Sequence, residues 1–361
     1  MLAERLKEKD YLPLTAGVKS AEDWPRRRAE LMEALQYYCY GYMPKGPLSV
    51  EATVQKRDEH VYADKAVQER VFLQVETDNG PYRFPVDFFI PKDAGKPPVI
   101  LNLAFRRTLL DRYVPVEEIL DRGYALAVVC YEDVTSDDHM GGFDTGLCAR
   151  LIKPKRGPHE TGKIGVWAWA ASRILDWLYT RDDVDASKTA VLGHSRLGKT
   201  ALWAAATDER FWCACSNDSG FGGAACKRHG HGERVRDFIR AGSWDWYCEA
   251  FKNDLDREDD SPYDQHYLLS AIAPRLLCVG SAEQDQGADP EAEFLTALTA
   301  SEAWTLLGEK GLVCPDRMPQ PGDCFGEGKI QYHLRAGPHF LSRTDWNRYM
   351  DFMDRARGLG R

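Results

Sequence analysis

Long apolar runs are missing from this 361-residue sequence. No stretch reaches the roughly 18 consecutive apolar residues of a membrane-spanning helix, so we expect no transmembrane segment. The first fifteen residues, MLAERLKEKDYLPLT, lack the continuous apolar segment of a secretory signal peptide. From these two absences we expect a cytoplasmic protein that does not act on a membrane.

An excess of basic residues is missing as well. The chain has 47 lysines and arginines against 56 acidic residues, which gives a formal net charge of -9. Proteins that bind nucleic acids usually carry a basic patch, so we expect no nucleic-acid partner. No internal repeat is visible, which excludes a solenoid.

The ten cysteines do not form a zinc motif. No pair has Cys-x-x-Cys spacing, and no combination of Cys and His has the spacing of a zinc site. Cys130 and Cys278 lie inside apolar runs, where a thiol packs as a small hydrophobic group. We therefore interpret the cysteines as reduced thiols and expect neither a metal nor an organic cofactor.

The first part of the chain predicts helices followed by antiparallel strands. Residues 1–49 are largely polar and helical in pattern, with an amphipathic stretch from Trp24 to Tyr42. Alternating apolar and polar residues then predict strands at 50–61, 70–76 and 82–90, and Asp-Asn-Gly at 78–80 is typical of a hairpin turn.

From residue 97 the pattern predicts an α/β fold. Short apolar runs alternate with helical stretches such as 165–179 and 199–206. Uninterrupted apolar strands alternating with helices favour a mainly parallel sheet with helices on both faces. We expect these strands at 98–103, 125–131, 189–193, 212–216, 275–280 and 330–334. The whole chain, 1–361, then forms one domain, with 1–49 as a helical extension packed on it, and ligands bind at the carboxyl ends of its strands.

A serine follows one of these predicted strands at a sharp turn. Residues 193–199 read GHSRLGK and precede a helical stretch. Strand, sharp turn with Ser195, then helix is the context of the nucleophile elbow of an α/β-hydrolase. The usual second glycine is Leu197 here, and Gly198 follows one residue later. The alternative is that Ser195 only caps the following helix.

The general base is expected on the loop after the last strand. α/β-Hydrolases place their catalytic residues in the order Ser, acid, His. His339 follows the predicted strand 330–334 and is therefore the candidate base. We expect His194 to point away from Ser195. The remaining candidates that we considered are surface residues (His229, His231), a packed strand residue (His333) or unassigned (His159, His266).

Two aspartates qualify as the third member of the triad. Asp218 follows the strand at 212–216, and Asp285 follows the strand at 275–280, which is the more usual place for the acid. Either carboxylate would hold His339 in the required tautomer. Asp289 precedes a proline and is interpreted as a turn residue.

Several motifs, taken together and in order, resemble the glucuronoyl esterase family, carbohydrate esterase family 15, in particular its bacterial branch. The GHSRLGK segment is similar to the family's G-C/H-S-R-x-G-K signature, which explains Leu197. The other matching segments are SNDSGFGGAA (216–225), GE (232–233), DQH (264–266), APR (273–275), DQGADP (285–290), RAGPH (335–339) and DW (345–346).

The resemblance implies a role for each matching residue. It implies Ser195 as nucleophile, His339 as base, Asp218 or Asp285 as acid, and Arg196 as a contributor to the oxyanion hole. It also implies that Lys199 and Glu233 contact the sugar. One position departs from the family: its sugar-stacking Trp is Gly287 here.

We therefore expect a serine carboxylic-ester hydrolase that acts on a small-molecule or oligosaccharide carbohydrate ester. The proton of Ser195 passes to His339, and the oxyanion accepts hydrogen bonds from the Arg196 N–H and from an N–H near Ala104 to Arg106. The alternatives are an acetyl (xylan) esterase that deacetylates sugars with the same triad, and a hydrolase-fold protein that binds sugar without turnover.

Overall fold

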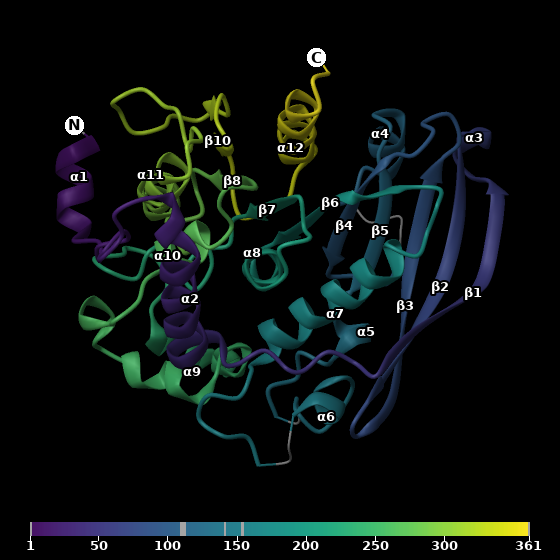
Figure 1. Ribbon diagram of the computed structural model, residues 1–361, viewed down its shortest axis with the longest axis horizontal. Helices are drawn as coiled ribbons and strands as arrows, with labels where there is room; N and C mark the ends of the chain where they lie inside the picture. Colours follow the sequence, from purple (N-terminus) through teal and green to yellow (C-terminus); the bar gives the residue numbers. More distant parts are fainter. Residues whose placement is uncertain (1, 109–112, 141, 153–154, 360–361) are drawn as a thin grey trace.

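The computed structural model describes residues 2–108, 113–140, 142–152 and 155–359. In these residues ten strands form one mixed sheet in the order β1-β2-β3-β5-β4-β6-β7-β8-β10-β9 (Figure 1). The strands are β1 (Ser49–His60), β2 (Ala66–Thr77), β3 (Gly80–Pro91), β4 (Pro98–Ala104), β5 (Ala125–Cys130), β6 (Asp185–His194), β7 (Cys213–Asn217), β8 (Leu276–Ala282), β9 (Cys324–Phe325) and β10 (Ile330–Arg335).

Twelve α-helical segments accompany these strands in the described residues. They are α1 (Leu2–Lys9), α2 (Trp24–Leu35), α3 (Val61–Asp64), α4 (Val116–Asp121), α5 (Tyr131–Val134), α6 (Cys148–Leu151), α7 (Lys163–Leu178), α8 (Arg196–Thr207), α9 (Val235–Ala241), α10 (Gln265–Ser270), α11 (Pro290–Leu306) and α12 (Arg343–Ala356). Among the described helices, none is both long and apolar enough to cross a membrane.

The antiparallel part of the sheet is the part predicted from residues 50–90. β1 pairs with β2, β2 with β3 and β3 with β5, all antiparallel. Thr77 pairs with Gly80 across the predicted Asp-Asn turn, and Gly80 has a φ of +94°, a conformation that glycine adopts without strain. These strands lie at one end of the molecule in Figure 1.

The remaining strands form the parallel part. Parallel pairing links six strands, in the order β5, β4, β6, β7, β8 and β10. The carboxyl ends of these six strands therefore lie along one edge of the sheet. The two-residue strand β9 adds an antiparallel edge to β10, and two residues are too few for an alternation pattern to predict.

Helices cover both faces of the sheet. On one face, α7 and α8 pack side chains such as Trp167 and Leu202 against strand residues such as Leu101. On the other face, α4 and α12 pack side chains such as Ile119 and Trp346 against the opposite faces of the same strands. Alternate side chains of a strand point to opposite faces, which is why nearly every residue of β4, β5 and β7 is buried.

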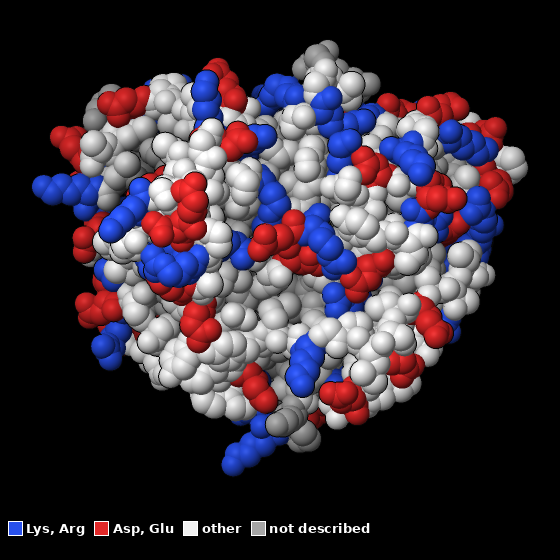
Figure 2. Space-filling view, in the orientation of Figure 1, with Lys and Arg blue, Asp and Glu red and all other residues white. Residues whose placement is uncertain are grey.

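The N-terminal segment packs on the first of these faces. Trp24, Leu31 and Leu35 of α2 belong to the same buried cluster as the sheet. The predicted amphipathic stretch from Trp24 to Tyr42 divides into α2 and a π-helical turn at Gln36–Tyr40. Charges of both signs intermingle on the face of the molecule in Figure 2.

Candidate active site

Ser195 occupies a strained turn between β6 and α8. Its backbone has φ 57° and ψ −129°, which costs free energy in a residue with a side chain. The Ser195 N–H donates to the Asn217 carbonyl at 2.8 Å, which ties the turn to the end of β7. A Cβ at Gly193 would lie 2.1 Å from the Leu197 carbonyl oxygen, so the turn requires glycine two residues before the serine.

The hydroxyl of Ser195 does not cap α8. Ser195 stands at the N-cap position of that helix, yet its side chain forms no capping hydrogen bond. Gly198 is the point where the helix packs most tightly against the end of β7 and the residues after it. A Cβ at Gly198 would lie 3.0 Å from the Ser219 Cβ and 3.1 Å from the Ser216 Oγ. This close approach explains why the second glycine stands at 198 and not at 197.

His339 and Asp285 meet across two loops at the same edge of the sheet. His339 follows β10, Asp285 follows β8, and the His339 Nδ1 lies 2.5 Å from the Asp285 Oδ2. Burial raises the pKa of Asp285, but the hydrogen bond with His339 and the Ala288 N–H outweigh this effect and hold the pKa below its usual range. Asp285 is therefore an ionised partner that orients the ring of His339.

Asp218 lies on the other side of the same histidine but has a different partner. One carboxylate oxygen of Asp218, one of Asp285 and one ring nitrogen of His339 all lie within 4.8 Å of one another. The Asp218 Oδ2 accepts hydrogen bonds from the Arg335 Nη2 at 3.0 Å and the Phe340 N–H at 3.3 Å. Burial raises the pKa of Asp218 well above its usual range, and the Glu293 carboxylate raises it further.

His194 packs beside the candidate base. Its ring packs on the ring of His339, with centroids 4.3 Å apart, and its Nδ1 lies 2.7 Å from the Asn217 Oδ1. Burial and the neighbouring His339 lower the pKa of His194 to about 3, so this ring is neutral at pH 7.

Arg196 is held by residues that no sequence motif identified. Its guanidinium forms a short ion pair with Asp137 and lies 4.6 Å from the centre of the Trp246 ring. The Trp246 Nε1 donates to the other Asp137 oxygen at 2.7 Å. In the described part of the chain, the buried Arg196 Nε has no hydrogen-bond partner, so this N–H remains available to a ligand.

Lys199 and Glu233 occupy different environments. Lys199 is buried, and its Nζ donates to the Ser219 carbonyl at 2.5 Å. Burial lowers the pKa of Lys199, an effect that Glu233 opposes. Glu233 is exposed, and its backbone N–H donates to the Gly287 carbonyl at 3.0 Å. A Cβ at Gly232 would lie 2.4 Å from that carbonyl oxygen, which accounts for the Gly-Glu pair.

A buried carboxylate behind the site was not identified from the sequence. Glu293 of α11 accepts hydrogen bonds from the Ser219 and Gly220 N–H groups at 2.9 and 2.8 Å, and from the Ser281 hydroxyl at 2.6 Å. Burial raises the pKa of Glu293 to about 7. The residue stands in an ordinary helical pattern, so only its tertiary partners reveal it.

The other histidines lie outside this cluster. His229 and His231 are exposed, as expected, and His333 is buried against Asp345 at 2.8 Å. His159 stacks on Tyr37, and the His266 Nε2 lies 2.9 Å from the Leu12 carbonyl oxygen. Asp289 caps α11 through the Ala292 N–H at 3.0 Å, in keeping with its interpretation as a turn residue.

Among the described residues, the side chains of two groups lie close enough to one another to bind a metal ion. The first is Asp218, Asp285 and His339, where the guanidinium of Arg335 on Asp218 disfavours a second cation. The second is a buried group of thiols, Cys213, Cys215 and Cys278, on the α12 face of the sheet. Strand register brings Cys215 opposite Cys278, a proximity that sequence spacing does not indicate.

The catalytic candidates face an open surface. Ser195, Asp218, Asp285 and His339 follow four consecutive strands of the sheet, β6, β7, β8 and β10. His339 has 44% of its side chain exposed, and Gly287 and Glu233 beside it are exposed as well. An open site of this kind admits an ester group that projects from a larger carbohydrate.

The chain is similar to proteins described as esterases. A profile of the family described as glucuronyl esterase, fungi, matches residues 73–308. Carbohydrate esterase MZ0003, from an unknown prokaryotic organism, is 33% identical to this chain. The alignment has a length of 389 residues, gaps included, and covers 96% of this chain and 88% of that protein. A 4-O-methyl-glucuronoyl methylesterase from Hypocrea jecorina is 30% identical over 305 residues, which cover 81% of this chain and 60% of that protein.

A solved structure agrees with the sequence matches. The glucuronoyl esterase from Solibacter usitatus has a TM-score of 0.85 to this chain at 33% identity, and the similarity covers 93% of this chain and 94% of that one. The chain therefore belongs to the glucuronoyl esterases of carbohydrate esterase family 15, which are serine carboxylic-ester hydrolases with the α/β-hydrolase fold.

Proposed function

We propose that this protein hydrolyses esters of a uronic acid carboxyl group, with Ser195 as nucleophile, His339 as base and Asp285 as the triad acid. The observation that carries the proposal is the 2.5 Å contact between the His339 Nδ1 and the Asp285 Oδ2, beside a serine held at φ 57°. A positioned base with its own orienting acid is the arrangement that activates a serine hydroxyl.

The tautomer of His339 follows from this contact. An ionised Asp285 only accepts hydrogen bonds, so the Nδ1 carries the proton and the Nε2 is free to take one. The Nε2 removes the proton of Ser195 as its Oγ attacks the ester carbonyl carbon. Among the described residues, the Ser195 hydroxyl has no hydrogen bond with His339, a contact that in many hydrolases tightens only when substrate binds.

Arg196 stabilises the negative charge that develops on the carbonyl oxygen. Its backbone N–H lies in the first turn of α8, where helix N–H groups lack internal partners. Its buried side-chain Nε has no partner in the described part of the chain and adds a charged donor. One donor of this kind contributes about 3–4 kcal/mol to transition-state stabilisation. A backbone N–H near Ala104 to Arg106, at the end of β4, is the second proposed donor.

Both halves of the reaction use the same groups. The tetrahedral intermediate breaks its bond to the alcohol oxygen, which leaves with the proton held on His339. Water then attacks the acyl-enzyme, His339 takes a proton from that water, and Ser195 is regenerated as the uronic acid departs. The chemistry needs no redox partner, because every step transfers a proton or an acyl group.

The substrate assignment rests on polar groups around the nucleophile. Glu233 is exposed, and Lys199 stands near the start of α8. The carboxylate of Glu233 and the ammonium of Lys199 are suited to hydrogen bonds with sugar hydroxyls. The name of the Hypocrea jecorina relative supports a glucuronoyl methyl ester as the class of substrate. Gly287 leaves this side of the site without an aromatic wall, which favours a less selective sugar position.

The test compares three substrates with purified protein: benzyl glucuronate, methyl glucuronate and acetylated xylo-oligosaccharides. We expect turnover of the two glucuronate esters, and we expect Ser195→Ala and His339→Ala to lower kcat by about 10⁶ while the fold is retained. His229→Ala, which removes an exposed histidine outside the site, is the matched control.

Preferential release of acetate would show that the protein is an acetyl esterase and not a glucuronoyl esterase, and the serine mechanism would still hold. Retention of normal turnover by Ser195→Ala would remove the mechanism itself. Labelling of Ser195 by a serine-directed phosphonate separates these cases, since a dead site does not react.

A further inference from the structure

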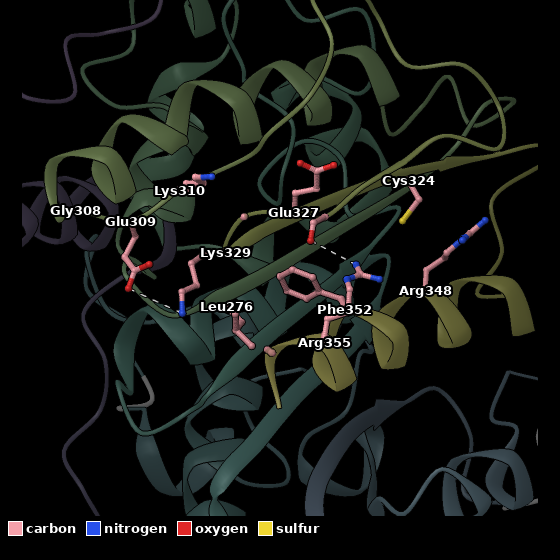
Figure 3. A pocket seen from close by; sticks show the side chains of 13 residues that line it. Leu276, Gly308, Glu309, Lys310, Cys324, Glu327, Lys329, Arg348, Phe352 and Arg355 are labelled. Carbon is pink, nitrogen blue, oxygen red and sulfur yellow. Dashed lines mark hydrogen bonds and ion pairs between the residues drawn. The ribbon is translucent and has the colours of Figure 1, made fainter. Parts of the chain in front are cut away.

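A cavity of the described residues lies far from the catalytic cluster. It has a volume of about 790 Å³ and is lined by α12, by the segment after α11 and by the segment before β10 (Figure 3). Leu276 at the amino end of β8 forms part of its wall, whereas Asp285 follows the carboxyl end of that strand. A strand of this length spans roughly 20 Å, so the cavity is separate from the ester site.

The cavity is basic although the protein is acidic. Four cationic side chains, Lys310, Lys329, Arg348 and Arg355, line it together with two acidic ones, Glu309 and Glu327. This leaves an excess of two positive charges in a concave surface, in a chain with a formal net charge of -9. A concave wall concentrates the field of its charges, so the cavity attracts anions that the rest of the surface repels.

The cations of α12 are not neutralised by acids of the same helix. Asp351 stands one turn from both Arg348 and Arg355, close enough to pair with either, and Asp354 directly precedes Arg355. Both acids bind Arg122 on the other side of the helix instead, at 2.9 and 2.6 Å.

The two arginines therefore lack carboxylate partners in the described part of the chain. The Arg355 Nη2 reaches only neutral oxygens, at 3.4 Å (Gln331 Oε1) and 3.5 Å (Gly326 carbonyl). Arg348 is half-buried and makes no hydrogen bond or ion pair with any described residue. Arg355 is exposed and Arg348 half-buried, and an anion in the cavity would give both guanidinium groups the counter-charge that they lack.

The shape of the cavity also depends on a glycine. A Cβ at Gly326 would lie 2.7 Å from the Arg355 Nη2, so the absence of a side chain leaves room for this guanidinium. Phe352 and Leu276 supply an apolar surface beside the charges, and Figure 3 shows the Phe352 ring next to the Arg355 guanidinium. Such a wall suits a ligand with a short carbon body.

We propose that this cavity is a second binding site, for a small organic dianion such as a dicarboxylate or a phosphate ester, held by Arg348 and Arg355. Planar guanidinium groups bind carboxylate and phosphate oxygens in a forked geometry. Lys329 is already within 4.0 Å of Glu309, which leaves the two arginines and Lys310 as the groups that meet the ligand.

Isothermal titration calorimetry at low salt tests this site with four probes: succinate, inorganic phosphate, glucuronate and glucose. We expect saturable one-site binding of succinate, of phosphate or of both, with glucuronate at least about tenfold weaker and glucose inactive. The comparison of succinate with phosphate identifies which source of the dianion the site prefers. Binding of glucuronate or glucose as tight as that of both dianions would overturn the proposal.

Variants distinguish binding of the dianion in this cavity from binding to other charged parts of the surface. Arg348→Ala and Arg355→Ala should each weaken binding of the preferred dianion about tenfold or more, because each removes charged hydrogen bonds. Gly326→Ala should also weaken it, since the added methyl group displaces the Arg355 guanidinium without changing any charge. Arg343→Ala is the matched control on the same helix, because Arg343 binds Glu118 outside the cavity.

The outcomes decide the proposal in either direction. A tenfold loss in the two cavity variants with an unchanged Arg343→Ala variant supports it. No binding of either dianion, or an equal loss in all three arginine variants, overturns it. Ester hydrolysis should stay within twofold of the wild type in every variant, which verifies that the fold is intact.

Discussion

The guanidinium of Arg335 binds the Asp218 carboxylate at 3.0 Å and at the same time binds Asp345 at 2.9 Å. One buried cation therefore serves two buried carboxylates. Asp345 also accepts hydrogen bonds from His333 and Ser342, which hold its pKa below the usual range despite burial. Asp218 has one oxygen without a partner in the described residues, and its pKa is raised. Asp285 is thus the carboxylate next to His339 whose charged form its surroundings favour.

We predict that Asp285 and Asp218 have unequal roles in catalysis. Asp285→Asn should lower kcat by about 10³–10⁴, because an amide at this position favours the wrong tautomer of His339. Asp218→Asn should keep kcat within about tenfold but lower the melting temperature, because Arg335 loses a buried partner. Steady-state kinetics and thermal unfolding of both variants measure the two effects. An equal loss of kcat in the two variants would restore Asp218 as a second triad acid.

The sequence could predict the fold and could place the candidate serine, acids and histidine at one edge of the sheet, because both follow from local patterns. The apolar runs located the strands to within a few residues, and the order Ser195, acid, His339 followed from the strand sequence. The choice between Asp218 and Asp285 could not be made, since each follows a strand at the correct edge. It depends on Arg335, whose side chain contacts Asp218 only after β7 and β10 have been placed in one sheet.

The roles of Asp137 and Glu293 could not be predicted from the sequence for the same reason. Asp137 lies in an irregular loop, and Glu293 stands in a helix without a special motif. Each acts through contacts with a segment distant in the chain, Arg196 and Ser219 respectively.

We predict that Asp137 positions Arg196 for catalysis. Asp137→Ala removes the ion pair with the Arg196 guanidinium and the hydrogen bond from the Trp246 Nε1, so the donor loses its fixed place. We expect kcat to fall about tenfold to a hundredfold, less than the ~10²–10³ for loss of an oxyanion donor, with little change in KM. Asp138→Ala, which removes an adjacent exposed aspartate, is the control.

A double-mutant cycle distinguishes positioning from a general structural effect. If Asp137 acts through Arg196, the double variant Asp137→Ala/Arg196→Ala should have the same kcat as Arg196→Ala alone. Independent, additive losses in the two single variants would show that Asp137 has another role. Asp137→Glu should recover part of the activity, because it restores a carboxylate within reach of the guanidinium.

We predict that Glu293 makes the stability of the fold dependent on pH. Burial raises its pKa to about 7, whereas an unfolded glutamate has a pKa of about 4.3. Between these values the folded chain keeps a proton that the unfolded chain has lost. Stability from this group is therefore fully present below about pH 4.3 and is lost as the pH rises through about 7.

Thermal unfolding of wild type and Glu293→Gln across this range measures the effect. Glutamine keeps an acceptor for the Ser219 and Gly220 N–H groups but does not ionise. The melting temperature of the wild type should therefore fall relative to that of Glu293→Gln as the pH increases from about 4.5 to about 7.5. Parallel curves for the two proteins would show that Glu293 does not titrate in this window.

The final prediction concerns Gly287, where the family carries a tryptophan that packs on the sugar. The structure leaves space for such a side chain: a Cβ here would lie 3.7 Å from the Asp285 Oδ1 and 4.0 Å from the Glu233 Cγ, which are ordinary contacts. Gly287 is exposed. Trp246 is buried against Arg196 and Asp137, and Trp244 stacks with Lys252.

Gly287→Trp should therefore tighten the binding of glucuronate esters without disturbing the fold. A ring that packs on the sugar contributes about 1–3 kcal/mol, which corresponds to a decrease in KM for benzyl glucuronate of about fivefold or more. Gly287→Ala, which adds a Cβ but no ring, controls for the backbone change and should leave KM unaltered. An unchanged KM in Gly287→Trp would mean that the sugar does not lie over residue 287, and the proposed contacts of Lys199 and Glu233 with the same sugar would then have to be abandoned, because Glu233 adjoins this position.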